Sequence, residues 1–197
     1  MENKFWSHKT VEVSDKAKIG EGTKIWHNCQ VLDNAQIGKN CVIGHNCLVD
    51  GGAKIGNNVK IESNTDVWNL VELKDYVFIG PSVVFTNDPN PRAKYSKKDY
   101  PQYGKWEATI IEEGVSIGAN ATIVCGNKIG KWAFVGAGSV VTKDISDYAL
   151  VVGVPGKIIG WVCKCGNKLN FDSNDKAICK ICDRKYSEKE EKVNQLK

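Results

Sequence analysis

Residues 17–47 read AKIGEGTKIWHNCQVLDNAQIGKNCVIGHNC, and nearly the same six-residue phrase occurs five times within them. Each phrase contains a branched aliphatic residue that lies six positions after that of the previous phrase, as in Ile19, Ile25 and Val31. A strand alternates its faces with a period of two and a helix repeats near 3.6, so neither element alone explains a period of six. The stretch therefore indicates a coil that repeats its geometry along the chain.

The same period extends over most of the sequence. Every sixth residue is aliphatic or aromatic in two long series, one before and one after a gap. The members are Val13, Ile19, Ile25, Val31, Ile37, Ile43, Val49, Ile55, Ile61, Val67, Leu73, Ile79 and Phe85, then Ile111, Ile117, Ile123, Ile129, Val135 and Val141. A six-residue period sustained over this length is typical of a parallel β-helix whose flat sides each take one phrase. We therefore predict an all-β solenoid.

Two further positions of the phrase agree with this prediction. The third residue after each aliphatic one is mostly Asn or Gly, the residues that best tolerate a positive φ at a tight corner. These corner residues are Gly22, Asn28, Asn34, Asn40, Asn46, Gly52, Asn58 and Asn64. The fourth is small or slim, as in Cys29, Cys41, Cys47 and Ala53, and suits a narrow interior. Three sides make a triangular coil of eighteen residues, and such coils stack ~4.8 Å apart.

Composition excludes several classes of protein. The chain has 197 residues and a net charge of +4, with 25% charged residues, which is too weak a bias to indicate a nucleic-acid partner. The N-terminal MENKFWSHKTVEV lacks the apolar core of a signal peptide, and no apolar run reaches membrane-spanning length. We therefore expect a cytoplasmic protein with no membrane partner, whose eight cysteines are thiols or metal ligands.

The period is interrupted once, because Phe85 and Ile111 are 26 positions apart and 26 is not a multiple of six. The intervening residues 86–110 are rich in proline, aromatic and basic residues. A solenoid can eject a loop at one corner while the coils on either side still stack, and long loops in compact folds are usually functional. We therefore expect residues 86–110 to form an ejected loop with a role in function.

The repeat strongly resembles that of the hexapeptide-repeat acyltransferases, and the resemblance implies a left-handed β-helix. Residues 77–92, VFIGPSVVFTNDPNPR, and residues 116–161, SIGANATIVCGNKIGKWAFVGAGSVVTKDISDYALVVGVPGKIIGW, look like the UDP-2-acetamido-3-amino-2,3-dideoxyglucuronate N-acetyltransferases of bacterial O-antigen synthesis. The resemblance covers roughly residues 10–161. Related acyltransferases acting on dTDP-3-amino-3,6-dideoxyhexoses look similar. That sugar remains the alternative substrate, and a catalytically silent assembly module is a third hypothesis.

The resemblance implies attack of a sugar amine on the thioester carbonyl of acetyl-CoA. Asn87 matches the asparagine of the family's FTN phrase and is expected to hold the amine or a water beside it. Asn69 lies eighteen residues earlier and is expected to stack in the same column. The loop contains no histidine, so we expect a neutral amine that needs positioning rather than a general base. His27 matches a histidine of the aminosugar transferases and is expected to border the nucleotide.

Other residues are expected to bind the rest of the two substrates. Arg92 offers a planar fork suited to a uronate carboxylate or a diphosphate. Small residues eighteen apart should form a track for the pantetheine arm, with free backbone N–H groups: Gly118, Ala119, Gly136 and Ala137. Lys143 and Lys157 should flank the end of the track and meet CoA phosphates. The resembling enzymes are trimers with sites between neighbouring prisms, which implies a homotrimer here.

Beyond Trp161 the repeat stops and a cysteine pattern begins. CKCGNKLNFDSNDKAICKIC places Cys163 and Cys165 on one turn and Cys179 and Cys182 on another. Two such thiolate pairs can close a tetrahedron around Zn²⁺, although the first pair is one residue shorter than the usual C-x-x-C. A segment this short and this poor in apolar residues could hardly fold without a metal. The pattern predicts a structural zinc ribbon.

Three segments follow from these patterns. We expect a β-helix over residues 1–161, a zinc-ribbon-like module over 162–186 and a charged tail over 187–197 that is helical or frayed. A histidine-bound metal within the coils is disfavoured, because His27 and His45 supply only two regularly spaced ligands where three are needed.

Overall fold

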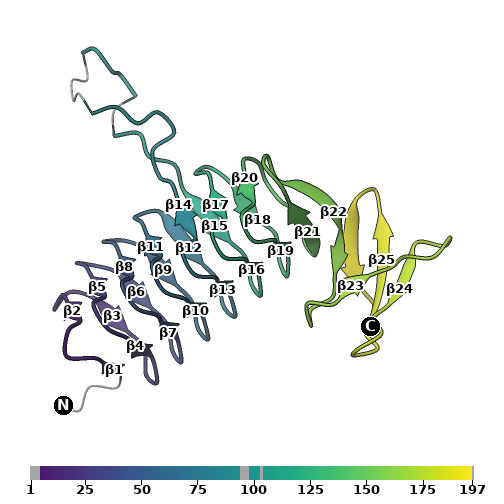
Figure 1. Cartoon of the computed structure of the whole chain (residues 1–197), viewed down its shortest axis with the longest axis horizontal. Coiled ribbons are helices and arrows are strands. Elements are labelled where there is room, and N and C mark those ends of the chain that lie inside the picture. Colours follow the sequence, from purple (N-terminus) through teal and green to yellow (C-terminus); the bar gives the residue numbers. More distant parts are fainter. Residues whose placement is uncertain (1–4, 94–97, 103, 197) are drawn as a thin grey trace.

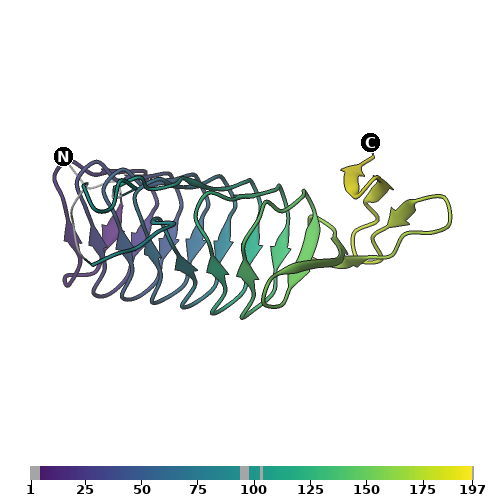
Figure 2. The ribbon, with the colours of Figure 1, turned by 90° about the horizontal axis from the view of Figure 1, so that it is seen from above.

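The computed structural model describes residues 5–93, 98–102 and 104–196, and every regular element within them is a β-strand (Figure 1). The strands stack into a long prism that carries a smaller module at its C-terminal end (Figures 1 and 2). The predicted all-β, left-handed parallel β-helix is confirmed. No helix of the described residues is long and apolar enough to cross a membrane.

Three sheets form the sides of the prism, and successive coils add parallel strands to each of them in turn, while β22 and β23 extend sheet A in antiparallel pairing. Sheet A runs β1 (Trp6–Ser7), β4 (Lys24–Ile25), β7 (Val42–Ile43), β10 (Lys60–Ile61), β13 (Phe78–Ile79), β16 (Ser116–Ile117), β19 (Phe134–Val135), β21 (Ala149–Val152), β22 (Lys157–Val162) and β23 (Lys168–Leu169). Sheet B runs β2 (Glu12–Val13), β5 (Gln30–Val31), β8 (Leu48–Val49), β11 (Asp66–Val67), β14 (Val84–Phe85), β17 (Thr122–Ile123) and β20 (Val140–Val141). Sheet C runs β3 (Lys18–Ile19), β6 (Gln36–Ile37), β9 (Lys54–Ile55), β12 (Val71–Leu73), β15 (Thr109–Ile111) and β18 (Lys128–Ile129).

The core is a set of stacked aliphatic columns inside the prism. Ile25 pairs with Ile43 and Ile43 with Ile61 in parallel register, so like side chains lie directly above one another. All three are fully buried. The six-residue period therefore sets the register as well as the sides, because every eighteenth residue returns to the same column.

Cysteine and threonine occupy the small interior position for a reason beyond size. The Cys29 thiol donates to the carbonyl oxygen of Gly44 at 2.8 Å, and the Cys41 thiol donates to that of Gly56 at 3.1 Å. The Thr23 hydroxyl likewise bonds to the next coil. These short donors satisfy corner carbonyls that the strand ladder leaves unpaired, which a buried carbonyl requires.

The corners adopt the positive φ that the sequence predicts. All eight predicted corner residues do so: Gly22, Asn28, Asn34, Asn40, Asn46, Gly52, Asn58 and Asn64. Equivalent corners are also occupied by bulkier residues that disfavour this conformation, among them Leu70 at 67°, Tyr76 at 61° and Trp132 at 59°. The coil geometry imposes the conformation on whichever residue falls there.

The loop leaves the prism after β14 and projects well away from it (Figure 1). It returns two residues earlier than the predicted range of 86–110. Thr109 and Ile110 already pair with Val71 and Glu72 in β15, because the next side of the coil has begun. Residues 94–97 and 103 of this loop lie outside the described residues.

The C-terminal module differs from the expectation at its very end. Residues 187–197 were predicted to be a charged helix or a frayed tail, and this prediction is wrong. The chain forms a three-stranded antiparallel sheet of β24 (Lys176–Ile178), β25 (Lys185–Lys189) and β26 (Lys192–Gln195). Tyr186 and Val193 are buried in this sheet. These two side chains provide its apolar packing, although most residues around them in the sequence are charged or polar.

Candidate functional site

The residues predicted to act together fall on two different corners of the prism. The Asn87 corner follows sheet B, and strand register stacks on it Asn69, Asn87, Glu107, Cys125 and Lys143. The Gly-Ala corner follows sheet A, and strand register stacks on it His27, His45, Gly118–Ala119 and Gly136–Ala137. One side of the prism, on the order of 15 Å across, separates the two corners. A single chain therefore does not bring Asn87 to the predicted cofactor track.

Asn87 stands where the loop departs, directly above Asn69 as predicted. Both side chains are half-buried. Asn69 is held in place, since its backbone N–H donates to the Asp50 carboxylate at 3.2 Å and its amide oxygen lies over Gly52. Among the described residues no side chain bonds to the Asn87 amide, which leaves that amide available to a ligand.

Glu107 is a residue of this corner that sequence reasoning missed. Thr109 pairs with Val71, so Glu107 occupies the same level as Asn87 in the same coil. Its backbone N–H donates to the Asn87 carbonyl at 3.0 Å and closes the neck of the loop. A carboxylate oxygen of Glu107 lies against the Cα of Gly126 in the next coil. The only signal in the sequence was its place at the loop's return, since a lone glutamate carries no motif.

The Gly-Ala corner differs from the prediction in which amides are free. The Gly118 and Gly136 N–H groups are used in the ladder, each donating to a carbonyl of the next coil at 2.7 Å. Of these four track residues, Ala119 and Ala137 are the two whose N–H groups have no backbone partner among the described residues. The glycines serve close packing instead, because a Cβ on Gly118 would lie 2.5 Å from the Ala137 nitrogen. The track therefore offers two amides.

The two predicted CoA lysines also lie apart. Lys143 is exposed and continues the Asn87 corner, two residues beyond β20. Lys157 is exposed at the start of β22, opposite Val152. Only Lys157 belongs to sheet A, which leads into the Gly-Ala corner. Within one chain the two lysines therefore lie on different sides of the prism, and their joint contact with CoA phosphates stays a prediction that involves two copies.

His27 belongs to an aromatic column at the N-terminal end of the Gly-Ala corner. The His27 and His45 rings stack with centroids 4.9 Å apart, and their Nδ1 atoms lie 3.2 Å apart. The His8 ring packs against His27 from the other side, tilted by 35° with centroids 3.6 Å apart, and the Trp26 centroid lies 6.2 Å from that of His27. Burial, followed by the charges of its neighbours, lowers the pKa of His8. The column presents flat rings several coils away from Ala119.

Arg92 lies on the loop itself and is exposed. Its guanidinium donates to the neighbouring Pro91 carbonyl at 2.8 Å. It lines a hollow of about 240 Å³ together with Asn90, Tyr100 and Gln102. The described contacts of Arg92 are within the loop, and none joins it to Asn87.

A second hollow of about 500 Å³ lies on sheet B beside the histidine column. Glu12, Gln30 and Asp66 are among the residues that line it. Two carboxylates disfavour a diphosphate there. This hollow therefore gives no support to nucleotide binding.

The four C-terminal cysteines converge as predicted. Their Sγ atoms all lie within 4.8 Å of one another, with contacts of 3.4 Å for Cys163–Cys182, 3.5 Å for Cys165–Cys179 and 3.6 Å for Cys165–Cys182. A disulfide would need about 2.05 Å. Tetrahedral zinc, with Zn–S near 2.3 Å, needs sulfur atoms about 3.8 Å apart. The geometry fits a metal and not a pair of disulfides.

Comparison with known proteins places the solenoid among hexapeptide-repeat folds. The family model described as bacterial transferase hexapeptide (six repeats) matches residues 16–51, and that of the hexapeptide repeat of succinyl-transferase matches residues 108–143. The acetyltransferase domain of PglB from Neisseria gonorrhoeae FA1090, in complex with acetyl coenzyme A, is 21% identical with a TM-score of 0.51. The alignment covers 79% of this chain and 58% of that one. This likeness shows the fold.

Two curated relatives are similar in sequence over part of the chain. The dTDP-3-amino-3,6-dideoxy-alpha-D-galactopyranose 3-N-acetyltransferase of Aneurinibacillus thermoaerophilus is 53% identical over 88 residues, which cover 45% of each protein. The serine acetyltransferase of Bacillus pumilus (strain SAFR-032) is 35% identical over 94 residues, covering 48% of this chain and 42% of the relative. The matches thus span less than half the length of either relative.

Proposed function

We propose that this chain is an N-acetyltransferase that transfers the acetyl group of acetyl-CoA to the 3-amino group of a nucleotide-linked sugar. The observation that supports the proposal most is the 53% identity, over 88 residues, with a dTDP-3-amino-3,6-dideoxy-alpha-D-galactopyranose 3-N-acetyltransferase. The half-buried Asn87 amide and the backbone N–H groups of Ala119 and Ala137 supply groups suited to the reaction. Synthesis of a bacterial surface polysaccharide such as O-antigen is the setting we propose for it.

The sugar that the comparison favours is a dTDP-3-amino-3,6-dideoxyhexose. The motifs of the chain resemble first those of the UDP-linked 3-aminouronate enzymes, and the dTDP sugar named for the similar relative reverses that order. The uronate keeps one argument, since the exposed Arg92 guanidinium could pair with its carboxylate. We therefore retain it as the second candidate.

The proposed reaction needs positioning more than proton transfer. The free amine attacks the thioester carbonyl carbon, and the tetrahedral intermediate expels the CoA thiolate, which takes up the proton released from nitrogen. The Asn87 side-chain oxygen accepts a hydrogen bond from the amine and directs its lone pair. The N–H of Ala119 or Ala137 donates to the carbonyl oxygen as negative charge develops on it. Such alignment contributes ~7–11 kcal/mol to the lowering of the barrier.

Glu107 adds a carboxylate at the level of Asn87. An amine that arrives as ammonium must lose a proton before it attacks, and this carboxylate can accept it. In the proposal Glu107 assists the reaction below the pKa of the amine, and Asn87 positions the amine at every pH.

The separation of the two corners supports a shared site. If acetyl-CoA lies along the Gly-Ala corner, its thioester reaches Asn87 only when the Gly-Ala corner of one copy faces the Asn87 corner of another. Two different corners in contact make a heterologous interface, which forms a ring when the rotation between neighbouring copies closes. A triangular prism with one such contact per copy suits a homotrimer with three equivalent sites.

We also propose that the cysteine cluster holds one structural Zn²⁺. Four protein thiolates leave no coordination position for substrate or water, so the ion takes no part in acetyl transfer. Reduced thiols of this kind persist in a reducing compartment, which fits the expected cytoplasmic location.

A rate comparison tests the proposed activity. Purified protein is mixed with acetyl-CoA and either the dTDP-3-amino-3,6-dideoxyhexose or the UDP-3-aminouronate, and release of the CoA thiol is followed. We expect turnover with the dTDP sugar to exceed that with the UDP sugar. The reverse order would restore the uronate as substrate. If no CoA thiol is released with either sugar and acetyl-CoA does not bind, the protein is a catalytically silent assembly module.

A further inference from the structure

The C-terminal end of the solenoid is closed by a strand that leads directly into the cysteine cluster. Strands β19 and β21 pair in parallel, but β21 and β22 pair antiparallel, so the chain turns back and covers the free edge of β21. An uncovered edge would present unpaired N–H and C=O groups, and repeat proteins need terminal caps for this reason. β22 ends at Val162, and the next residue is the ligand Cys163.

We infer that zinc binding locks this cap onto the solenoid, and that Tyr186 is the residue through which the metal site holds the last coil. The inference rests on the proposed zinc site and is independent of the proposed acetyl transfer. Three sets of contacts carry it: donors aimed at the sulfurs, the burial of Tyr186, and the contact of Tyr186 with Tyr148.

The sulfurs are surrounded by hydrogen-bond donors. The Tyr186 hydroxyl lies 3.1 Å from the Cys163 sulfur, and the same oxygen accepts a hydrogen bond from the Lys164 N–H at 3.1 Å. Because Tyr186 already accepts there, its own proton is free to point at sulfur. The Arg184 guanidinium donates to Cys182 at 3.2 Å. Four thiolates around Zn²⁺ carry two excess negative charges, and such donors stabilise them and orient the ligands.

The two cysteine turns have the shape that metal binding needs. Each turn is closed by a residue with positive φ, Gly166 at 85° and Asp183 at 56°. The Gly166 N–H donates to the Cys163 carbonyl, and the Asp183 N–H donates to the Cys179 carbonyl. The shortened first pair therefore does not prevent convergence of the sulfurs.

Tyr186 connects this site to the β-helix. Its side chain is fully buried, and its ring meets that of Tyr148 edge-on, with centroids 5.5 Å apart. Tyr148 is a corner residue of the last coil with φ of 61°, and its carbonyl accepts from the Val162 N–H at 2.8 Å. A second contact is made by the Lys164 ammonium, which lies 5.0 Å from the centre of the Trp132 ring.

The consequence reaches the Gly-Ala corner. The Gly136 N–H donates to Val151 in β21, the strand that β22 covers. Loss of zinc frees Cys163 and Tyr186, which lets β22 separate from β21 and exposes the coil that carries Gly136–Ala137. Strands β4 to β10 lie several coils away from the module (Figure 1), so zinc should not affect them.

Hydrogen exchange read by mass spectrometry, with metal content measured in parallel, tests this inference. We expect one zinc per chain, and removal by a chelator should speed exchange in β21 and β22 at least ~10-fold while β4 to β10 stay unchanged. Added Zn²⁺ alone should restore protection. Co²⁺ in its place should give the intense visible bands of a tetrahedral thiolate site.

Two variants separate the metal site from the cap. Tyr148→Asn keeps a residue suited to positive φ but removes the ring beneath Tyr186, so zinc should remain bound while β22 exchanges faster. Tyr186→Phe keeps the ring and removes the donor, so zinc affinity should fall about 10-fold while zinc-saturated protein keeps its protection. Tyr76→Asn, at an equivalent positive φ far from the module, is the matched control and should change neither.

Three results are distinguishable. Zinc-dependent protection of β21 and β22 supports the cap. Bound zinc whose removal leaves β21 and β22 protected overturns the cap and keeps the zinc site. Failure to bind zinc at all overturns both, and leaves the acetyltransferase proposal to its own assay.

Discussion

Asn87 and Glu107 are two polar residues that meet where the loop closes, joined by the 3.0 Å bond between the Glu107 N–H and the Asn87 carbonyl. The sequence could single out Asn87 because it belongs to a recognisable phrase. It could not single out Glu107, since the level at which the loop rejoins the prism depends on strand pairing.

Replacing Asn87 with alanine should lower kcat at least ~10-fold, because the amine loses the group that orients it. The oligomeric state should not change, which light scattering can verify. Asn170→Ala, an exposed position of the C-terminal module, is the control and should retain full activity. An Asn87→Ala enzyme with the wild-type rate would remove this side chain from the mechanism.

Glu107→Gln should lower kcat/KM at least ~10-fold below the pKa of the substrate amine and by less above it, because only the protonated amine needs an acceptor. A pH profile of kcat/KM measures this difference. Glu113→Gln, on another corner of the same coil, should leave the profile unchanged. Equal losses at all pH values in Glu107→Gln would contradict a proton-accepting role.

Backbone strain in a coil depends on which residue occupies the positive-φ position at its corners. Asn40, Asn58, Tyr76, Gly114 and Trp132 occupy one column of corners, and all the non-glycine members have φ between 54° and 61°. Asparagine tolerates this conformation, whereas a bulky aromatic residue does so at a cost of roughly 1 kcal/mol.

Tyr76→Asn should therefore raise the free energy of unfolding by about 1 kcal/mol, because Tyr76 is largely exposed and loses little packing. Asn58→Tyr, one coil earlier in the same column, should lower it by a similar amount. Denaturant unfolding measures both. Destabilisation by both substitutions would show that packing, rather than backbone strain, dominates at this corner.

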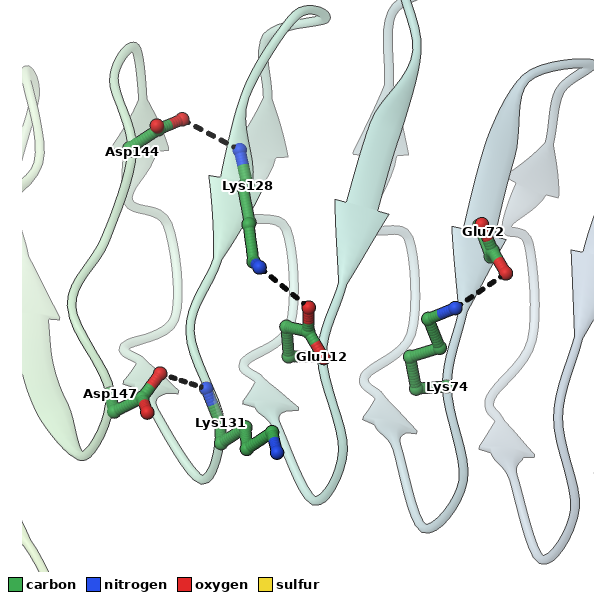
Figure 3. A network of polar contacts seen from close by, with 7 residues as sticks. All are labelled: Glu72, Lys74, Glu112, Lys128, Lys131, Asp144 and Asp147. Atoms are coloured by element: carbon green, nitrogen blue, oxygen red, sulfur yellow. Dashed lines mark hydrogen bonds and ion pairs between the residues drawn. The ribbon is translucent and has the colours of Figure 1, made fainter.

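Sheet C carries charged pairs on its outer face (Figure 3). Lys128 bonds to Glu112 at 2.8 Å, and Lys74 bonds to Glu72 at 2.6 Å. The hydrogen bond from Lys74 lowers the pKa of the Glu72 carboxyl. Both partners of the second pair are partly exposed, so the pair contributes on the order of 0.5 kcal/mol.

The pH dependence of this contribution to stability follows from the direction of the Glu72 pKa shift. A lowered pKa in the folded state means that the stabilisation is present above the unfolded pKa of about 4.3 and is lost as pH falls through the folded pKa. Lys74→Met should therefore destabilise slightly at pH 7 and not at pH 3. Unfolding in denaturant at both pH values checks this. A difference that persists at pH 3 would point to lost packing of the lysine stem.

At the scale of the whole molecule, the repeat alone determined the fold but not the site. The period gave the sides, the interior columns and the eight predicted corners, because each depends only on position within eighteen residues. It did not show that Asn87 and Ala137 lie on different corners, since the loop shifts the count between them. It also gave no indication of β25 and β26, because their buried residues Tyr186 and Val193 are flanked by charged residues in the sequence.

A shared site makes a prediction that one chain cannot satisfy. Asn87→Ala and Ala137→Trp should each be inactive, the second because its bulky ring blocks the exposed track. When the two are co-expressed, some interfaces pair an intact Asn87 corner with an intact Gly-Ala corner. In randomly mixed trimers about a quarter of the sites should recover activity. No recovery would place the whole site within a single chain.

The position of the transferred acetyl group in the product tests the proposed reaction. Zinc-loaded protein is incubated with ¹³C-acetyl-CoA and a dTDP-3-amino-3,6-dideoxyhexose, and the sugar is analysed by mass spectrometry and NMR. We expect one labelled acetyl group on the nitrogen at carbon 3, formed together with one equivalent of free CoA. Label on a hydroxyl oxygen, or none on this sugar or on the UDP-3-aminouronate, would contradict it.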